Sequence, residues 1–129
     1  MPSTMDVRDF AARFMTALGR GDPDEVRAFY APDAALWHNF DDVAQTVDEN
    51  LNLMAWMARK LPQRHYRVTR LELLPDGWMQ QHVLEATLAD GRPFRLLACC
   101  VVQVKDGVIT RIDEYLDPAQ AAVLRTLRS

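Results

Sequence analysis

Residues 93–116 read PFRLLACCVVQV, then KDG, then VITRIDEYL, which is two extended apolar runs joined by a short turn. β-branched, aliphatic and aromatic residues that alternate with polar ones are typical of half-buried strands. An Asp-Gly pair between two such runs is a strong hairpin signal. The stretch therefore predicts an antiparallel strand pair over residues 93–104 and 108–116.

Two further extended segments precede this pair. They run over about residues 65–74 and 78–88, and the turn signals Pro75-Asp76-Gly77 and Asp90-Gly91 follow them. Proline and glycine at such positions favour a tight turn over continued strand. The carboxyl-terminal half of the chain therefore predicts an antiparallel meander of four strands.

The amino-terminal half follows a helical period instead. Apolar residues recur at helical spacing over residues 7–18, and Gly19 and Gly21 then end the pattern. Asp22-Pro23-Asp24-Glu25 combines a capping residue, a proline at the first helical position and acidic side chains. We expect one helix over residues 7–18 and a short second helix that continues through Tyr30 and ends at Pro32.

A short strand over residues 34–39 separates the second helix from a third. Thr46-Val47-Asp48-Glu49 is a capping box that begins the third helix, and Pro62 closes it. Asp117-Pro118 caps a terminal helix through Leu127. This order of elements favours the α+β class, with the helices packed on one face of a strongly curved, mostly antiparallel sheet. A hollow between such a sheet and its helices is a common place for a small-molecule site.

Length and composition fit a single domain over residues 1–129. The chain carries a formal net charge of −3, with acidic and basic residues mixed along it. It offers no basic surface for nucleic acid, and no apolar run is long enough to cross a bilayer. The amino terminus does not have the composition of a signal peptide. We therefore expect a cytoplasmic protein that binds neither nucleic acid nor a membrane.

Cysteine and histidine usage argues against a disulfide or a metal centre. Cys99 and Cys100 are neighbours in an extended run, where successive side chains point to opposite faces of the sheet. The three histidines are scattered, so a zinc site has no support from sequence spacing. We expect no disulfide between the cysteines, no metal and no cofactor.

Glu114 is an acidic residue that the strand pattern places on an apolar face, together with Val108, Ile112 and Leu116. A carboxylate removed from water is costly unless it is paired or hydrogen-bonded, and its proton affinity becomes tunable. We interpret Glu114 as a catalytic acid or base. The alternative is a strand-end glutamate with a structural partner.

His82 is expected to point inward as well, because Gln80 and Leu84 share its face of the predicted strand. An inward histidine is often only a satisfied core residue, but a carboxylate on a neighbouring strand can orient its ring and stabilise its cation. We predict that His82 and Glu114 form a proton-transfer pair.

Trp37 and Asn39 share one face of the first strand. As inward residues they provide an aromatic wall and an amide able to position water or polarise a carbonyl group. His38 lies on the other face and becomes the inward residue if the phase of the strand shifts by one position. We predict Asn39 as the third catalytic residue, with His38 as the alternative.

Aromatic, methionine and aliphatic side chains of the predicted helices and strands are expected to form either a packed core or the wall of a pocket for an apolar ligand. The substrate-binding residues that we predict on this basis are Trp37, Phe14, Tyr30, Met54, Trp56, Met57, Leu84, Ala98 and Ile112.

Three phrases of the sequence resemble a known superfamily: RFMTALGRGD at residues 13–22, FYAPDA at 29–34 and DGVITR at 106–111. With the order of elements, they resemble the SnoaL-like and ketosteroid-isomerase-like members of the nuclear transport factor 2 superfamily over about residues 5–118. The resemblance implies a cystatin-like fold with a cone-shaped pocket. It also implies a homodimer, which the apolar outer residues Val83 and Val101 favour further.

Different branches of that superfamily match different residues. Ketosteroid isomerases have their tyrosine and two aspartates where this chain has Phe14, Asn39 and Cys100. Limonene-epoxide hydrolases resemble it at Trp37-His38-Asn39 and at residues 114–117, although their Arg-x-Asp falls at residues 82–84, where this chain has histidine and leucine. SnoaL-like cyclases use a histidine and an acid that correspond to His82 and Glu114.

The predicted function is acid–base chemistry on a small apolar organic molecule in an enclosed pocket. Isomerisation, cyclisation, dehydration and epoxide hydrolysis all fit, because each needs a shielded acid and base. The alternative is a non-catalytic ligand-binding or dimerisation module of the same fold.

Overall fold

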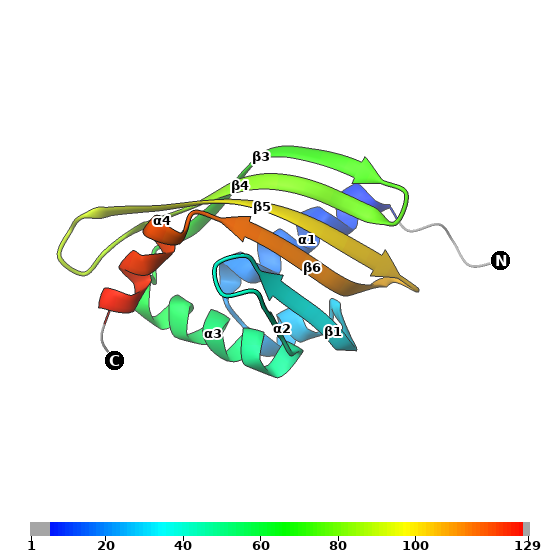
Figure 1. The fold of residues 1–129 in the computed structure, drawn as a ribbon, viewed down its shortest axis with the longest axis horizontal. Coiled ribbons are helices and arrows are strands. Elements are labelled where there is room, and N and C mark those ends of the chain that lie inside the picture. Colours follow the sequence, from blue (N-terminus) through cyan, green and yellow to red (C-terminus); the bar gives the residue numbers. More distant parts are fainter. Residues whose placement is uncertain (1–5, 128–129) are drawn as a thin grey trace.

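Four long antiparallel strands form the curved sheet that the turns predict. In the computed structural model, which describes residues 6–127, they are β3 (His65–Leu74), β4 (Gly77–Thr87), β5 (Pro93–Lys105) and β6 (Val108–Leu116). Each pairs with the next as a meander (Figure 1). Asp106 and Gly107 have positive φ in the turn before β6, a conformation that the Asp-Gly pair adopts easily. The predicted meander and the α+β class are confirmed.

The first strand is longer than predicted and pairs in parallel with the last. β1 runs over Tyr30–His38, beside β6, and a short strand that the sequence did not predict, β2 (Val43–Gln45), pairs antiparallel with β1. The sheet order is β2-β1-β6-β5-β4-β3.

The expectation that the second helix continues to Pro32 is wrong, because α2 (Pro23–Arg27) ends earlier and Tyr30 already begins β1. A proline disfavours helical backbone in the residue that precedes it. The register between β1 and β6 shifts between Tyr30 and Ala35, and Pro32, which has no N–H to donate, lies in that irregular stretch.

The other helices begin where the capping residues indicate. Asp6 caps α1 (Val7–Arg20), and Thr46 forms the expected capping box with Glu49 at the start of α3 (Val47–Lys60). Gly21 ends α1 in the left-handed conformation, at a φ of 73°. α3 lies across from the sheet, and its carboxyl-terminal end approaches α4 (Figure 1). No helix within residues 6–127 is long and apolar enough to span a bilayer.

The terminal helix is shorter than predicted. It consists of α4 (Pro118–Ala122), capped by Asp117, and a 3₁₀ turn, η1 (Val123–Thr126). A helix of this length gains little stability from its own hydrogen bonds, so packing decides its form. Leu124 and Leu127 pack against the buried cluster around Leu61.

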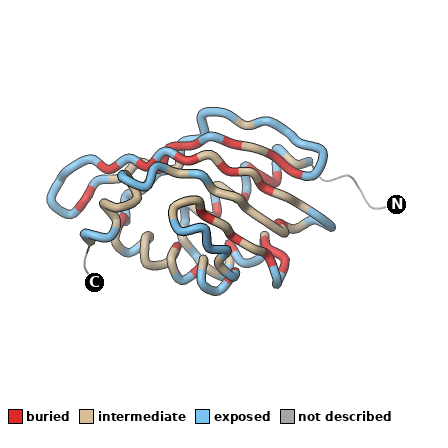
Figure 2. The backbone as a smooth tube through the Cα atoms, in the orientation of Figure 1, coloured by how far each residue is buried: buried red, intermediate tan, exposed pale blue. Residues whose placement is uncertain are grey.

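Buried apolar side chains form two clusters under the sheet. The larger one joins α1, α2 and β1 to the middle of the sheet around Trp78 and Ile109, which are fully buried. The smaller one joins the end of α3 to β4 and β5 around Leu61 and Phe94. The buried positions alternate along the central strands, as expected for a sheet with one covered face (Figure 2).

The apolar residues exposed on the outer face of the sheet are not the ones expected to support a homodimer. Val83 is only 6% exposed within the single chain, whereas Leu97 and Tyr115 are 43% and 52% exposed. The homodimer stays a prediction, and Leu97 and Tyr115 are the apolar side chains on which it now rests.

Candidate active site

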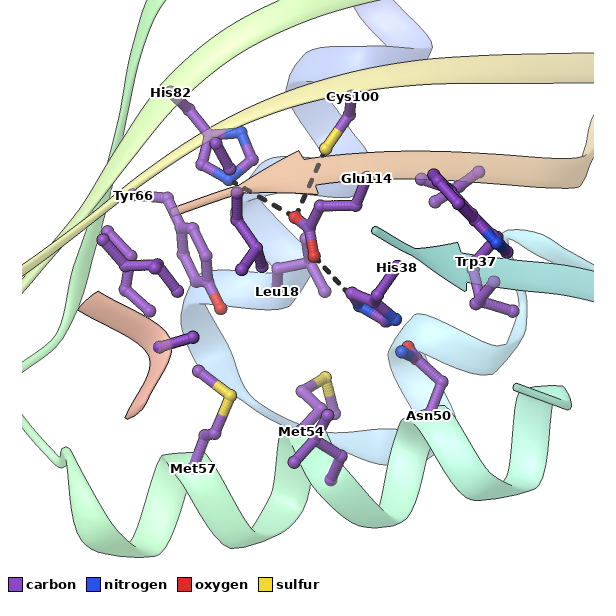
Figure 3. Close-up of a pocket in the computed structure, with 18 of the residues that line it drawn as sticks. Leu18, Trp37, His38, Asn50, Met54, Met57, Tyr66, His82, Cys100 and Glu114 are labelled. Carbon is purple, nitrogen blue, oxygen red and sulfur yellow. Dashed lines mark hydrogen bonds and ion pairs between the residues drawn. The ribbon is translucent and has the colours of Figure 1, made fainter. Parts of the chain in front are cut away.

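A cavity of about 490 Å³ lies between the sheet and the helices. Inward side chains of β1, β4, β5 and β6 form one wall, while α1 and α3 form the other, and the C-terminal residues Ala121, Leu124 and Arg125 contribute an edge. The lining is mostly apolar, with a few polar groups gathered around Glu114 (Figure 3). Such a cavity suits a small organic ligand.

The strand register brings Glu114 next to groups from neighbouring strands. Glu114 pairs with His38 of β1 on one side and with Cys100 of β5 on the other. Its carboxylate accepts a hydrogen bond from His38 Nε2 at 3.0 Å through Oε1 and one from Cys100 Sγ at 3.3 Å through Oε2 (Figure 3). The Glu114 side chain remains 23% exposed and lines the cavity. It therefore combines fixed partners with access to a ligand.

Glu114 and His38 stabilise each other's charged forms. Burial raises the pKa of Glu114, but the hydrogen bond and charge of His38, followed by the charge of His82 and the hydrogen bond from Cys100, outweigh it and hold this pKa below the ordinary glutamate value. Burial likewise lowers the pKa of His38, and the hydrogen bond and charge of Glu114 outweigh it and hold this pKa above the ordinary histidine value. Between the two pKa values the pair exists as a carboxylate and an imidazolium.

His82 faces the same carboxylate from β4, at a greater distance. Its Nε2 lies 3.9 Å from Glu114 Oε2, and its side chain is only 7% exposed. Burial lowers the pKa of His82 more than the charge of Glu114 raises it, so the net shift is downward. The structure thus brings Glu114 and His82 to one cavity, as expected, but the histidine in direct contact with the carboxylate is His38.

Cys100 completes the cluster. Burial raises the pKa of its thiol well above the ordinary value, and the neighbouring Glu114 raises it further, so Cys100 is a hydrogen-bond donor rather than a nucleophile. One donor atom each from His82, Cys100 and Glu114 lies within 4.8 Å of the others, a spacing that a divalent ion could bridge. The scattered positions in the sequence gave no sign of this cluster.

Two tyrosines place hydroxyl groups among the lining residues. Burial raises the pKa of Tyr66 to about 12, with Glu114 as the next cause, and burial raises the pKa of Tyr30 as well. Both phenols therefore stay protonated at neutral pH. They are available as hydrogen-bond donors to an oxygen atom of a ligand.

The predicted binding residues all lie at the cavity. Phe14 of α1, Tyr30 and Trp37 of β1, Met54, Trp56 and Met57 of α3, and Leu84, Ala98 and Ile112 of the sheet line it. Trp37 lies at its edge, where its Nε1 donates to Asp42 Oδ1 at 2.7 Å and its ring meets the Tyr115 ring edge-on. Whether these residues bind a substrate stays a prediction.

Asn39 does not belong to the site. Its Nδ2 donates to the Leu116 carbonyl oxygen at 3.2 Å, and its Oδ1 accepts from the Leu116 N–H at 2.9 Å. The placement of Asn39 in the cavity is wrong, because Leu36 and His38 are the inward residues of β1. The alternative phase of the strand, with His38 inward, is the observed one. Asn39 instead joins the ends of β1 and β6.

Replacing Asn39 with alanine should cost stability rather than chemistry. The substitution removes both hydrogen bonds to Leu116 and leaves its part-buried backbone groups unpaired, so unfolding should become easier by about 1–3 kcal/mol. Urea titration measures this loss. Turnover of the folded fraction should change less than about 10-fold, because no catalytic group is removed. A stable Asn39→Ala protein with a 100-fold slower reaction would instead restore the catalytic interpretation.

Sequence reasoning missed Cys100, Tyr66 and Gln80 as members of the site, and it offered His38 only as the alternative to Asn39. For His38 the only signal was the strand phase, which two similar faces left open. For Cys100 and Tyr66 the signal was alternation with known inward neighbours, since Cys100 follows Ala98 and Leu96 on one face of β5. Their approach to Glu114 depends on the register between paired strands, and the residue pattern within a single strand does not determine that register.

Comparisons with known proteins agree with this fold. The SnoaL-like domain family matches residues 11–112 of the chain. No curated protein matches it at the level of sequence. Among solved structures, it is similar to IdmH from Streptomyces antibioticus, a candidate polyketide cyclase, with a TM-score of 0.80 and 19% identity over 95% of this chain and 100% of that one.

Two other structures show the same fold. AclR from Streptomyces galilaeus, a candidate hydroxylase, has a TM-score of 0.82 and 15% identity over 98% of this chain and 89% of that one. A candidate SnoaL-like polyketide cyclase from Shewanella putrefaciens has a TM-score of 0.79 and 9% identity over 94% and 86% of the two chains. At such identities the likeness concerns the fold. The match of the family model over residues 11–112 shows that the chain belongs to the SnoaL-like domain family.

Proposed function

We propose that this protein is a cofactor-independent enzyme that moves a proton on a small, largely apolar carbonyl compound bound in the cavity. The observation that carries the proposal is the position of Glu114, a carboxylate on the wall of an apolar cavity that His38 holds at 3.0 Å. A buried acid–base pair with access to a ligand is what proton transfer from carbon requires.

In this proposal Glu114 is the general base. Its carboxylate removes a proton from the carbon next to the carbonyl group, and negative charge moves to the carbonyl oxygen. His82, Tyr66 and Tyr30 lie around the cavity as hydrogen-bond donors for that oxygen. His38 keeps Glu114 ionised in its apolar surroundings. Returning the proton to another carbon completes an isomerisation. Alternatively, attack of the carbanion on a second carbonyl group of the same molecule closes a ring, and the proton held by Glu114 then passes to the alkoxide oxygen that forms.

The fold supports a cyclase or an isomerase more than the other reactions. Polyketide cyclases are named among its structural neighbours, and the family includes isomerases. Epoxide hydrolysis has less support, because Leu84 stands where the limonene-epoxide hydrolases have their middle acid. Which carbonyl compound is bound depends on the shape of the apolar wall around Met54, Met57 and Trp56.

A non-catalytic binding module is the competing function. An open cavity of about 490 Å³ argues against a packed interior but suits a binding protein as well as an enzyme. A thermal-shift screen of multi-ring and chain-like carbonyl compounds identifies ligands whether the protein is an enzyme or a binding module, because a compound that binds only the folded state raises the stability of that state. Bound compounds that are recovered unchanged after prolonged incubation would support the module.

The pH dependence of turnover tests which group is the base. Because the pKa of Glu114 is lowered, the carboxylate is already ionised at pH values above the ordinary glutamate pKa of about 4.3. Over the pH range in which His38 is charged, we expect kcat/KM to stay flat as the pH falls, and to decrease only as the pH drops through the lowered pKa of Glu114. Steady-state rates measured in one buffer series at constant ionic strength give this profile. A fall centred at about pH 6.5 would identify an ordinary histidine base and contradict the proposal.

A further inference from the structure

A row of three buried polar side chains lies on the inward face of β4. Trp78, Gln80 and His82 are spaced two residues apart and have relative exposures of 0%, 2% and 7%. Trp78 Nε1 donates to Gln80 Oε1 at 2.9 Å, and Gln80 Nε2 lies 2.8 Å from His82 Nδ1. The row ends where the His82 ring reaches the cavity (Figure 3).

The indole fixes the orientation of the Gln80 amide. An indole N–H can only donate, so the atom facing Trp78 must be the amide oxygen. The amide nitrogen then faces His82, and it also donates to Met15 Sδ at 3.3 Å, another acceptor. Turning the amide over would place two donors, Trp78 Nε1 and Gln80 Nε2, against each other. Gln80 therefore presents an N–H to His82.

The amide in turn fixes the His82 ring. Because Gln80 Nε2 donates, His82 Nδ1 must accept, and the proton of the neutral ring resides on Nε2. Nε2 is the ring nitrogen that faces Glu114 Oε2, at 3.9 Å. Protonating Nδ1 would set its N–H against the amide N–H, so the row also disfavours the imidazolium.

We propose that Gln80 is a positioning residue that holds His82 in its neutral, Nε2-protonated form, so that His82 donates a hydrogen bond to the substrate oxygen while Glu114 transfers the proton. The inference rests on the proposed function for the role of His82, but the state of the ring follows from the hydrogen bonds alone. The two histidines then have different roles. His38 carries charge beside Glu114, and His82 stays neutral.

The groups around His82 are compatible with this state. Glu114 of β6 favours the charged ring, and His38 of β1 lies beyond that carboxylate and balances its charge. Cys100 of β5 and Tyr66 of β3, whose ring centroid is 5.8 Å from that of His82, are protonated and neutral. Met15 of α1 is uncharged. The downward shift of the His82 pKa, caused mainly by burial, points the same way.

The same hydrogen bonds bear on metal binding. A metal ion held by His82 Nε2 together with Cys100 and Glu114 would need the ring proton on Nδ1, where a metal-bound histidine normally donates to a carboxylate or a carbonyl group. Gln80 offers a donor at that position. The cluster is therefore built for proton chemistry rather than for an ion, despite its spacing.

Nitrogen NMR of the protein labelled with ¹⁵N-histidine tests the proposal without a substrate. In the wild-type protein, long-range ¹H–¹⁵N correlations should show His82 protonated on Nε2 at neutral pH. It should still be neutral below the ordinary histidine pKa of about 6.5. A wild-type ring protonated on Nδ1, or charged at pH 6.5, would overturn the proposal, and this measurement needs no variant.

Gln80→Glu keeps the shape of the side chain and the acceptor for Trp78, but presents a carboxylate oxygen to Nδ1. The ring should switch to the Nδ1-protonated form, and its pKa should rise by about one unit or more. Gln81→Glu is the matched control, since Gln81 is the exposed neighbour on the opposite face of β4 and should leave His82 unchanged. If His82 in Gln80→Glu keeps its proton on Nε2 and its pKa is unchanged, Gln80 does not position the ring.

Kinetics then separate this proposal from the proposed function. With a substrate in hand, and at a pH above the raised pKa of His82, where Nε2 carries no proton, Gln80→Glu should lower kcat by about 10-fold or more with little change in KM, because the lost donor acts on charge that develops in the transition state. A switched ring with an unchanged kcat would overturn the role of His82. If the ring switches but Glu114→Gln has full activity, the positioning of His82 by Gln80 is confirmed and the role of Glu114 as general base is contradicted.

Discussion

Glu114→Gln is expected to lower turnover by about 10²-fold or more, because it replaces the proposed general base with an amide that cannot accept a proton. The fold should lose only about 1 kcal/mol, since glutamine keeps the side-chain length and an oxygen that accepts from His38 Nε2. Single-turnover rates and a urea denaturation curve, measured on one preparation, give both quantities.

The matched control is Asp113→Asn, the same chemical change one residue earlier in β6. Asp113 pairs with Arg111 at 2.8 Å and does not line the cavity. Its variant should retain full turnover. An unchanged rate in Glu114→Gln would end the catalytic hypothesis, while a strongly destabilised protein whose folded fraction stays active would assign Glu114 a structural role.

The substitution expected to cost most stability is Trp78→Ala. Trp78 is fully buried, and its ring meets those of Phe10 and Phe14 edge-on at centroid distances of 6.0 and 6.4 Å. Removing it should cost about 3–5 kcal/mol, through lost burial and the void that remains. Denaturant titration followed by circular dichroism measures the change in the free energy of unfolding.

Trp56→Ala provides the comparison, since Trp56 is half-buried on α3 and lines the cavity. Its loss should cost clearly less stability, because water and the cavity already surround part of the ring, and should alter ligand binding instead. Equal losses of stability in the two variants would contradict the assignment of Trp78 to the core.

The sequence predicts the sheet well because its signals there are local. Each Asp-Gly turn fixes a hairpin without reference to the rest of the chain, and alternation within β6 is enough to place Glu114 inward. Local signals fail at β1. Its two faces, Leu36 with His38 and Trp37 with Asn39, carry similar mixtures of apolar and polar groups, so hydrophobicity cannot select the phase.

The features that the sequence does not predict, namely β2 and the cluster around Glu114, depend on pairing between distant segments of the chain. The three-residue strand β2 has exposed or half-buried side chains and exists only because β1 offers an edge. Cys100 approaches Glu114 through the register of β5 with β6, and His38 does so through the parallel pairing of β1 with β6. The residue pattern of a single strand predicts neither register. The cluster around Glu114 could therefore not be predicted before the pairing of the strands was known.

The parallel pairing of β1 with β6 also has a kinetic consequence. The hairpins from β3 to β6 join near neighbours, whereas the Asn39 contacts with Leu116 join residues 77 positions apart. Closing so long a segment costs more chain entropy than forming a hairpin and slows folding. His38 and Glu114 meet only when this closure takes place, so their ion pair should be among the last contacts to form as the chain folds.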